Sequence, residues 1–492
     1  MRSLISPLLF LAALGLGSPG FADEPAAFDR WFTDATLRVD YLQGGDATEE
    51  FITLDRVARQ GIWAGSRTHR IDPFEVGRTL VEVREPGTGE VLFSRRLDSY
   101  FGEYRTTTEA GNGVKRAYHA TVLVPFPKAK VKLLIKTRQK DRSDKTLLET
   151  EVDPDAPTTS GEPLTRSARV FDLQISGDPH SKVDVAIIAE GYTAQDEAKL
   201  QGDLKRFQEV FFSIEPFSSN RSKFNLRGVW QPSQDRGCDE PSRGVWKSTS
   251  VGASFDALGS ERYLLTEDNK ALRDIAAHAP YDVLYIMVNT SRYGGGGIYN
   301  LYCTFTADNQ WSPYVFLHEF GHHFAALADE YYTSSVAYND FFPKGVEPIE
   351  PNVTALLDPT NLKWKALASP GIALPTPWEK STYDDAEIAY QKRRETLNLK
   401  IGEASRSRAP ASELEALKAE AERVSLEHSN KMDDLLIKSP FANKVGAFEG
   451  AGYTSKGLYR PALDCIMFSK GTKPFCPVCR QAIERVIAYY GE

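Results

Sequence analysis

The residues best suited to chemistry in this sequence are two histidines four positions apart, with a glutamate directly after the first: His318, Glu319 and His322. On an α-helix the two imidazoles project about 40° apart around the axis, so both can reach one metal ion. A carboxylate beside the metal can take a proton from a water that the metal activates. The flanking sequence predicts such a helix, because it has apolar residues at helical spacing and no interior proline.

A catalytic zinc ion needs a third protein ligand besides the two histidines. Asp329 is the favoured candidate, the adjacent Glu330 is an alternative, and a later glutamate, Glu347 or Glu350, is another. Asp329 comes seven residues after His322, which is roughly 10 Å along a straight helix. The chain must therefore bend soon after the helix if Asp329 binds the same ion. Prolines beside the two later glutamates argue against a helix there.

The elements that position this motif are predicted to form the second of two domains. Residues 24–155 contain short alternating stretches separated by turn signals, which predicts an all-β sandwich domain. Residues 156–164 are polar and punctuated by proline and glycine, so we interpret them as a linker. Residues 165–492 alternate between strand and helix patterns, which indicates an α/β or α+β catalytic domain.

A helical insertion and an edge strand are predicted on either side of the motif. The insertion is interpreted as a solvated spacer, with covering the cleft or meeting a partner as the alternatives. Residues 384–436 have two long polar helical patterns broken near Pro410, which predicts a helical hairpin inserted in the catalytic domain, with His428 on its charged surface. Residues 298–305 follow four glycines and are expected to form an exposed edge strand. Such a strand can hold an extended peptide by main-chain hydrogen bonds, and a mobile glycine hairpin is the alternative.

The first 22 residues have the features of a signal peptide. Arg2 precedes an apolar run at residues 4–16, and a small-residue cleavage site follows at residues 20–22. We therefore expect a secreted or periplasmic protein, with an uncleaved anchor as the alternative. No later apolar run is long enough for an integral membrane span.

Composition and cysteine content narrow the class of protein further. The 492-residue chain has 41% hydrophobic residues and a formal net charge of -8, which argues against a nucleic-acid binder. The oxidising compartment of an exported protein favours disulfides. We therefore expect a bridge between Cys465 and the pair Cys476 and Cys479. The same pair is also typical of half a structural zinc site.

Several further motifs resemble those of the M64 metallopeptidases, also called the IgA peptidase family. The matching segments are Ala186-Ile-Ile-Ala-Glu-Gly-Tyr192, His318-Glu-Phe-Gly-His322, Leu327-Ala-Asp-Glu-Tyr331, Tyr459-Arg-Pro461, Cys465-Ile-Met467 and Phe475-Cys-Pro-Val-Cys479. The resemblance implies a metzincin-like zinc peptidase preceded by a β-sandwich domain. It also implies that Met467 belongs to a methionine turn beneath the metal, although an ordinary core methionine is the alternative.

The sequence thus predicts an exported zinc metalloendopeptidase acting on a protein or peptide substrate. One Zn²⁺ is expected on His318, His322 and Asp329, with Glu319 as the general base. Tyr459 is predicted to donate a hydrogen bond to the oxyanion, with Tyr453 behind it. Two other classes stay open: a zinc hydrolase of non-peptide amides, and a cell-surface or glycan-binding protein with a vestigial metal site.

Overall fold

The computed structural model describes residues 25–161, 167–333 and 342–491. The predicted signal peptide at residues 1–22 lies outside these described residues, and so does part of the predicted linker. Within the described ranges, no helix combines the length and the apolar character needed to cross a membrane.

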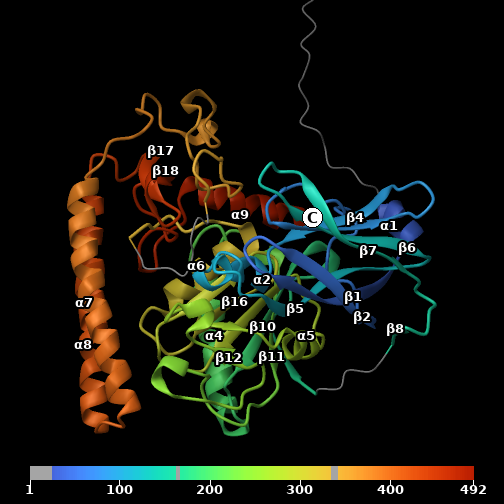
Figure 1. The fold of residues 1–492 in the computed structure, drawn as a ribbon, viewed down its shortest axis with the longest axis horizontal. Coiled ribbons are helices and arrows are strands. Elements are labelled where there is room, and N and C mark those ends of the chain that lie inside the picture. The colour runs from blue at the N-terminus through green and yellow to red at the C-terminus, as the bar shows by residue number, and fades with distance from the viewer. Residues whose placement is uncertain (1–24, 162–166, 334–341, 492) are drawn as a thin grey trace, which may run out of the picture.

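Two four-stranded sheets form an N-terminal β-rich region and enclose one apolar core (Figure 1). The sheet orders are β5-β1-β2-β8 and β4-β3-β6-β7. The strands are β1 (Phe32–Gly45), β2 (Glu50–Gln60), β3 (Thr79–Arg84), β4 (Val91–Leu97), β5 (Arg116–Pro127), β6 (Val131–Arg138), β7 (Asp144–Val152) and β8 (Thr159–Ser160). Three short helices accompany them: α1 (Pro25–Trp31), α2 (Tyr100–Tyr104) and α3 (Thr108–Gly111).

Strand β1 has a different chemistry on each face, as expected from the alternation of side chains along a strand. Leu37 and Val39 point into the core between the two sheets. Arg38 and Asp40 point the other way and are also buried. Arg38 pairs with Asp274 of helix α5 (Asn269–Ala276) at 2.6 Å, so buried charges join the β-rich region to the rest of the chain.

A mixed six-stranded sheet with the order β15-β16-β14-β10-β11-β9 forms the centre of the second region. The four inner strands run parallel, and the two edge strands run antiparallel to their neighbours. The strands are β9 (Arg169–Gln174), β10 (Val183–Glu190), β11 (Phe224–Trp230), β14 (Val283–Val288), β15 (Gly295–Ile298) and β16 (Tyr302–Thr306). A small pair, β12 (Ala253–Ser254) and β13 (Leu265–Thr266), lies outside this sheet.

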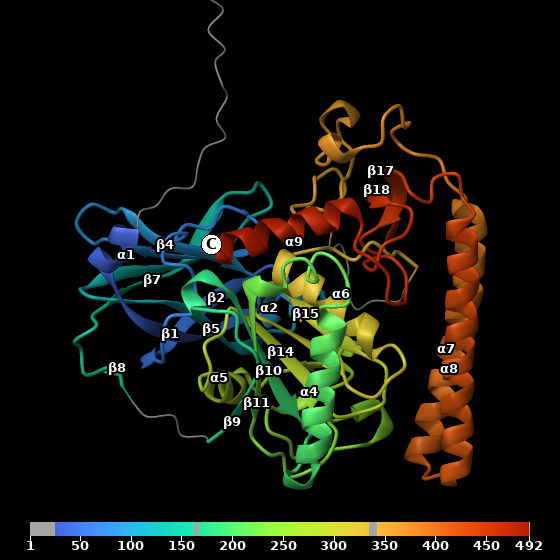
Figure 2. The ribbon, with the colours of Figure 1, turned by 180° about the vertical axis from the view of Figure 1, so that it is seen from behind.

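Helices cover both faces of this sheet, because both faces of its inner strands are apolar. Val185 and Ile187 of β10 pack in one cluster with α4 (Glu197–Phe211), α6 (Ser312–Ala325) and α9 (Pro477–Tyr490). Ala186 and Ile188 pack on the opposite side with α5. Figure 2 shows α4 in front of the sheet and α9 running toward the β-rich region. The expected combination of an N-terminal β-rich region with a mixed α+β region is confirmed.

A long antiparallel pair of helices, α7 (Lys380–Arg406) and α8 (Ala411–Ile437), stands beside the mixed sheet (Figure 1). Its inner side faces the cleft described below. His428 was expected on the charged surface of this pair, but it stacks on Tyr390 with 4.0 Å between ring centroids and hydrogen-bonds to Glu387. The expectation was wrong because the helix face that carries His428 meets α7 rather than solvent.

The C-terminal segment returns to the centre of the molecule. A hairpin of β17 (Val445–Ala451) and β18 (Thr454–Ala462) leads through a turn at residues 465–468 to α9. The hydroxyl of Tyr489 near the end of α9 donates to the carbonyl of His69, and Nδ1 of His69 donates to the carbonyl of Tyr489. These two bonds tie the helix to the β-rich region. All five cysteines are free, so the expected bridge from Cys465 to Cys476 or Cys479 is not formed.

Candidate metal centre

Helix α6, which carries the two histidines, lies directly on the glycine-rich edge strand β15. A Cβ atom at Gly297 would lie 2.6 Å from the backbone oxygen of Glu319 and 2.9 Å from Cβ of His322. Only glycine permits this close approach of strand to helix. The edge strand was expected at residues 298–305, but the glycines themselves form it, and β16 behind it is fully buried.

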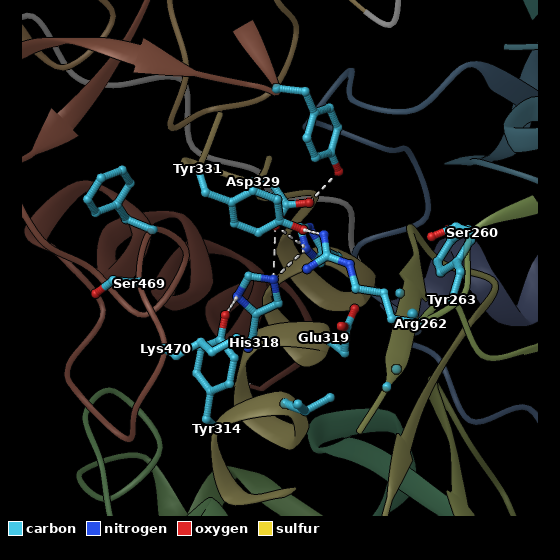
Figure 3. Close-up of a pocket in the computed structure, with 18 of the residues that line it drawn as sticks. Ser260, Arg262, Tyr263, Tyr314, His318, Glu319, Asp329, Tyr331, Ser469 and Lys470 are labelled. Atoms are coloured by element: carbon cyan, nitrogen blue, oxygen red, sulfur yellow. Dashed lines mark hydrogen bonds and ion pairs between the residues drawn. The ribbon is translucent and has the colours of Figure 1, made fainter. Parts of the chain in front are cut away.

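His318, His322 and Asp329 converge on one point in the cleft. Figure 3 shows His318 and Asp329 directed at one another there. Oδ1 of Asp329 lies 2.9 Å from Nε2 of His318 and 3.2 Å from Nε2 of His322. The two Nε2 atoms are 3.1 Å apart. Each of the three residues therefore directs one potential ligand atom at the same small volume.

The bend that this convergence requires occurs at Ala326. Helix α6 ends at Ala325, and Ala326 adopts the left-handed conformation with φ 49° and ψ 36°. Its N–H donates to the carbonyl of His322, and the N–H of Leu327 donates to the carbonyl of Gly321. This is the αL type of helix end, formed here by a residue other than glycine. The bend brings Asp329 back beside the two imidazoles.

Hydrogen bonds on the far side of each of these three side chains fix its orientation. Nδ1 of His318 donates to the carbonyl of Ile466 at 2.9 Å, and Nδ1 of His322 donates to the carbonyl of Leu327 at 2.5 Å. The hydroxyl of Tyr453 donates to Oδ2 of Asp329. With both Nδ1 atoms protonated, the Nε2 lone pairs face each other and Oδ1.

This arrangement fits a divalent metal with nitrogen and oxygen ligands. Oδ1 of Asp329 is buried, and no donor among the described residues is assigned to it as a hydrogen-bond partner. Three lone pairs at such separations repel one another unless a cation lies between them. Two imidazoles and one carboxylate are a usual ligand set for catalytic zinc.

Neighbouring charges shift the pKa values of the side chains at this site. Burial alone would lower the pKa of His322, but Asp329 and Glu319 outweigh it and raise that pKa to about 9. Burial works to raise the pKa of Asp329, yet the two imidazoles hold it well below its usual range. A proton therefore competes with a metal for His322 near neutral pH.

Glu319 lies beside the convergence point and lines the cleft, which has a volume of about 310 Å³. Burial raises the pKa of its carboxyl, against the lowering effect of His318 and His322. Arg262 and Tyr331 line the same cleft, and a guanidinium nitrogen of Arg262 donates to the Tyr331 hydroxyl at 3.2 Å (Figure 3). The ring of Tyr331 stacks on that of His318 with 6.1 Å between centroids.

Other residues singled out in the sequence lie elsewhere. Tyr459 pairs with Glu449 across the β17–β18 hairpin and is not among the described residues that line the cleft. Glu330 faces away from the two histidines, toward Cys479. Glu350 lines the cleft, and neither it nor Glu347 belongs to the His318, His322 and Asp329 group among the described residues.

Two buried residues support the site from below. A Cβ at Gly321 would lie 2.9 Å from the sulfur of Met467, so Met467 packs against α6 between its two histidines. His323 accepts the N–H of Leu284 and donates to the carbonyl of Ile298, and burial lowers its pKa to about 3. His323 thus fastens α6 to the sheet as a neutral side chain. The position of Arg262 in the cleft had no signal in the sequence, because only the fold brings that loop there.

Comparison with known proteins yields two family matches. The model described as IgA Peptidase M64 matches residues 171–487, which is more than half of the chain. The model described as Peptidase M64 N-terminus matches residues 27–149. No curated protein matches the chain.

Proposed function

Because the chain belongs to the IgA Peptidase M64 family, we propose that it is a zinc-dependent metalloendopeptidase in which His318, His322 and Asp329 hold one catalytic ion. The convergence of three ligand atoms within 3.2 Å of one another carries this proposal. The assignment of Glu319 as the general base is supported by its place beside that point and by its raised pKa.

The reaction we propose is hydrolysis of a peptide bond. Zinc, when bound, supplies a Lewis acid that polarises a carbonyl and makes a water more acidic. The Glu319 carboxylate accepts a proton from the water as the new oxygen–carbon bond forms. It then delivers that proton to the amide nitrogen as the carbon–nitrogen bond breaks, and so returns to its starting state. A pKa raised toward neutrality favours both transfers.

Negative charge that develops on the substrate carbonyl oxygen needs donors from the protein. Arg262 and Tyr331 line the cleft beside His318, and their position supports this role better than that of Tyr459, which the sequence favoured. Tyr453 acts through Asp329, because its hydroxyl is engaged with that carboxylate. We therefore assign Arg262 and Tyr331 to the oxyanion, and Tyr453 to positioning Asp329.

The rest of the proposal concerns how the substrate binds, where the protein is located and how its domains are organised. The outer edge of β15 beside Gly297 is suited to an extended peptide, which supports a metzincin-like mode of binding. The predicted signal peptide at residues 1–22 supports export. We retain residues 24–155 as an accessory domain, and residues 165–492 as the catalytic domain with a hairpin insertion at residues 384–436.

The test compares hydrolysis of casein by the wild type and by Glu319→Gln. We expect Glu319→Gln to keep its zinc and to lose about 10²–10⁴-fold in rate. Glu261→Gln is a matched control, because Glu261 lines the same cleft at 42% exposure, and we expect it to retain wild-type activity. Wild-type activity in Glu319→Gln would contradict the proposed base.

A further inference from the structure

A second group of metal-ligand side chains lies apart from the candidate catalytic centre. It consists of Glu330, Cys465, Cys476 and Cys479, and one ligand atom from each lies within 4.8 Å of the other three. All four residues are buried, with exposed fractions of 0%, 1%, 6% and 0%. They come from three segments: the residue after Asp329, the turn at residues 465–468, and the start of α9.

We call these four residues the thiol cluster. The distances between their ligand atoms match those expected around one shared metal ion. The sulfur atoms of Cys465 and Cys479 are 3.9 Å apart, and the sulfur of Cys479 is 3.1 Å from Oε1 of Glu330. Two thiolates bound at about 2.3 Å to a tetrahedral zinc are about 3.8 Å apart. No disulfide joins any of the three cysteines.

Glu330 is an independent sign that a cation belongs here. It is fully buried, and its Oε2 has no hydrogen-bond partner among the described residues. Its Oε1 accepts from the side-chain amide of Asn352 at 3.0 Å. Burying a carboxylate with an unpartnered oxygen among thiols is unfavourable unless a positive charge offsets it.

Burial raises the pKa of Glu330, Cys465 and Cys479, so the anionic form is favoured at Cys476 alone among the four residues. Cys476 is the N-cap residue of α9, where the helix dipole stabilises negative charge. At Glu330, burial holds the pKa well above its usual range, and the guanidinium of Arg460 offsets part of that effect. Arg460 is itself fully buried and donates to the backbone carbonyls of Gly450 and Leu463.

We propose that Glu330, Cys465, Cys476 and Cys479 bind a second, structural zinc ion. Three thiols and one carboxyl complete a tetrahedral shell without an open position for water, which distinguishes a structural site from a catalytic one. On binding, the three thiols and the carboxyl group of Glu330 release their protons to solvent, and no electrons are transferred. Four anionic ligands around Zn²⁺ leave an excess of negative charge, which Arg460 partly offsets.

This ion would hold together the two backbone segments that orient the catalytic ligands. The N–H of Glu330 donates to the carbonyl of Met467 at 2.9 Å. Cys465 directly precedes Ile466, whose carbonyl accepts the bond from His318. Glu330 directly follows Asp329. The structural ion therefore fixes the position of Asp329 relative to the turn that orients His318.

The experiment measures zinc content and zinc coordination in the full-length chain and in a His318→Ala, His322→Ala double variant. We expect about two zinc ions per chain in the wild type and about one in the double variant. X-ray absorption of the double variant should give zinc–sulfur distances of about 2.3 Å. This readout is independent of peptidase activity, so it separates a failure of the thiol site from a failure of the proposed function.

Variants of the cysteines complete the test. Cys476→Ser with Cys479→Ser should lose the sulfur-bound zinc and weaken zinc binding at the histidines. Cys238→Ser and Cys303→Ser are matched controls, because both cysteines are buried but lie outside the thiol cluster, and both should keep the wild-type zinc content. A double histidine variant that is folded by circular dichroism but binds no zinc, or binds it without sulfur, would overturn the proposal. A disulfide between two of the three cysteines in the isolated protein would do the same.

Discussion

The hydroxyl of Tyr453 donates a hydrogen bond to Oδ2 of Asp329, which leaves Oδ1 directed at the two imidazoles. The backbone reinforces this contact. The N–H of Tyr453 donates to the carbonyl of Tyr331, and the N–H of Gly452 donates to the carbonyl of Asp329. The turn between β17 and β18 is thus docked on the segment that carries Asp329, although the two lie far apart in the sequence.

Loss of the Tyr453 hydroxyl should therefore weaken metal binding. We predict that Tyr453→Phe lowers zinc affinity about 10- to 100-fold, the usual effect of removing a partner that orients a ligand. Competition with a chelator measures this, and excess zinc should restore activity. Tyr459→Phe is the control, because Tyr459 lies on the adjacent strand outside the cleft. Equal zinc affinities in the two variants would contradict the role given to Tyr453.

The left-handed conformation of Ala326 gives a second prediction. A residue with a Cβ is strained at φ 49°, whereas glycine is not. We expect Ala326→Gly to raise the free energy of unfolding by up to about 1 kcal/mol, because relief of strain exceeds the entropic cost of glycine. Ala325→Gly, one residue earlier within α6, should lower it by about the same amount. Chemical denaturation in the presence of a chelator measures the free energy of unfolding of both variants. A lower value for Ala326→Gly than for the wild type would show that Ala326 is not strained.

Stability should also depend on pH through Asp282. Burial raises the pKa of Asp282, and the neighbouring carboxyl of Asp184 raises it further. A carboxyl whose pKa is raised on folding stabilises the protein fully below its unfolded pKa of about 3.9, and this contribution is lost as pH rises through the raised value. Asp282→Asn keeps an acceptor for the N–H of Asp184, which Oδ2 of Asp282 binds at 3.0 Å.

We therefore predict that the stability of Asp282→Asn falls less than that of the wild type between acidic and mildly alkaline pH. Melting temperatures across that range provide the measurement. The exposed Asp434→Asn, at 75% side-chain exposure, serves as the control and should follow the wild type. A melting profile of Asp282→Asn that parallels the wild type would rule out this source of pH dependence.

Part of the candidate site could be predicted from sequence because it depends on local geometry. Helical spacing alone places His318 and His322 on one side of α6, and the reach of a straight helix requires a bend before Asp329. The contacts of Tyr453 and Arg262 could not be predicted, because they depend on how distant loops pack. Tyr459 was favoured over Tyr453 because nothing in the sequence reveals the irregular register of the β17–β18 hairpin.

In the fold, too, features that depend on local sequence could be predicted, and features that depend on tertiary packing could not. Apolar runs and alternation predicted a β-rich first region and alternating strands and helices in the second, since burial on one or two faces leaves that pattern in the sequence. The strands β7, β9, β17 and β18 were not predicted. The edge strand was misplaced because glycines have no side chain with which to signal a strand, and here their small size is what lets β15 contact α6. The meeting of Glu330 with three cysteines depended wholly on the tertiary structure.

We propose that His318, His322 and Asp329 together hold a zinc ion. Anomalous scattering at the zinc absorption edge from a crystal of the protein is the direct test. We predict a peak at about 2.0–2.2 Å from Nε2 of His318, Nε2 of His322 and Oδ1 of Asp329. A zinc-loaded crystal with no peak between these three atoms, or with a peak whose third protein ligand is a residue other than Asp329, would contradict it.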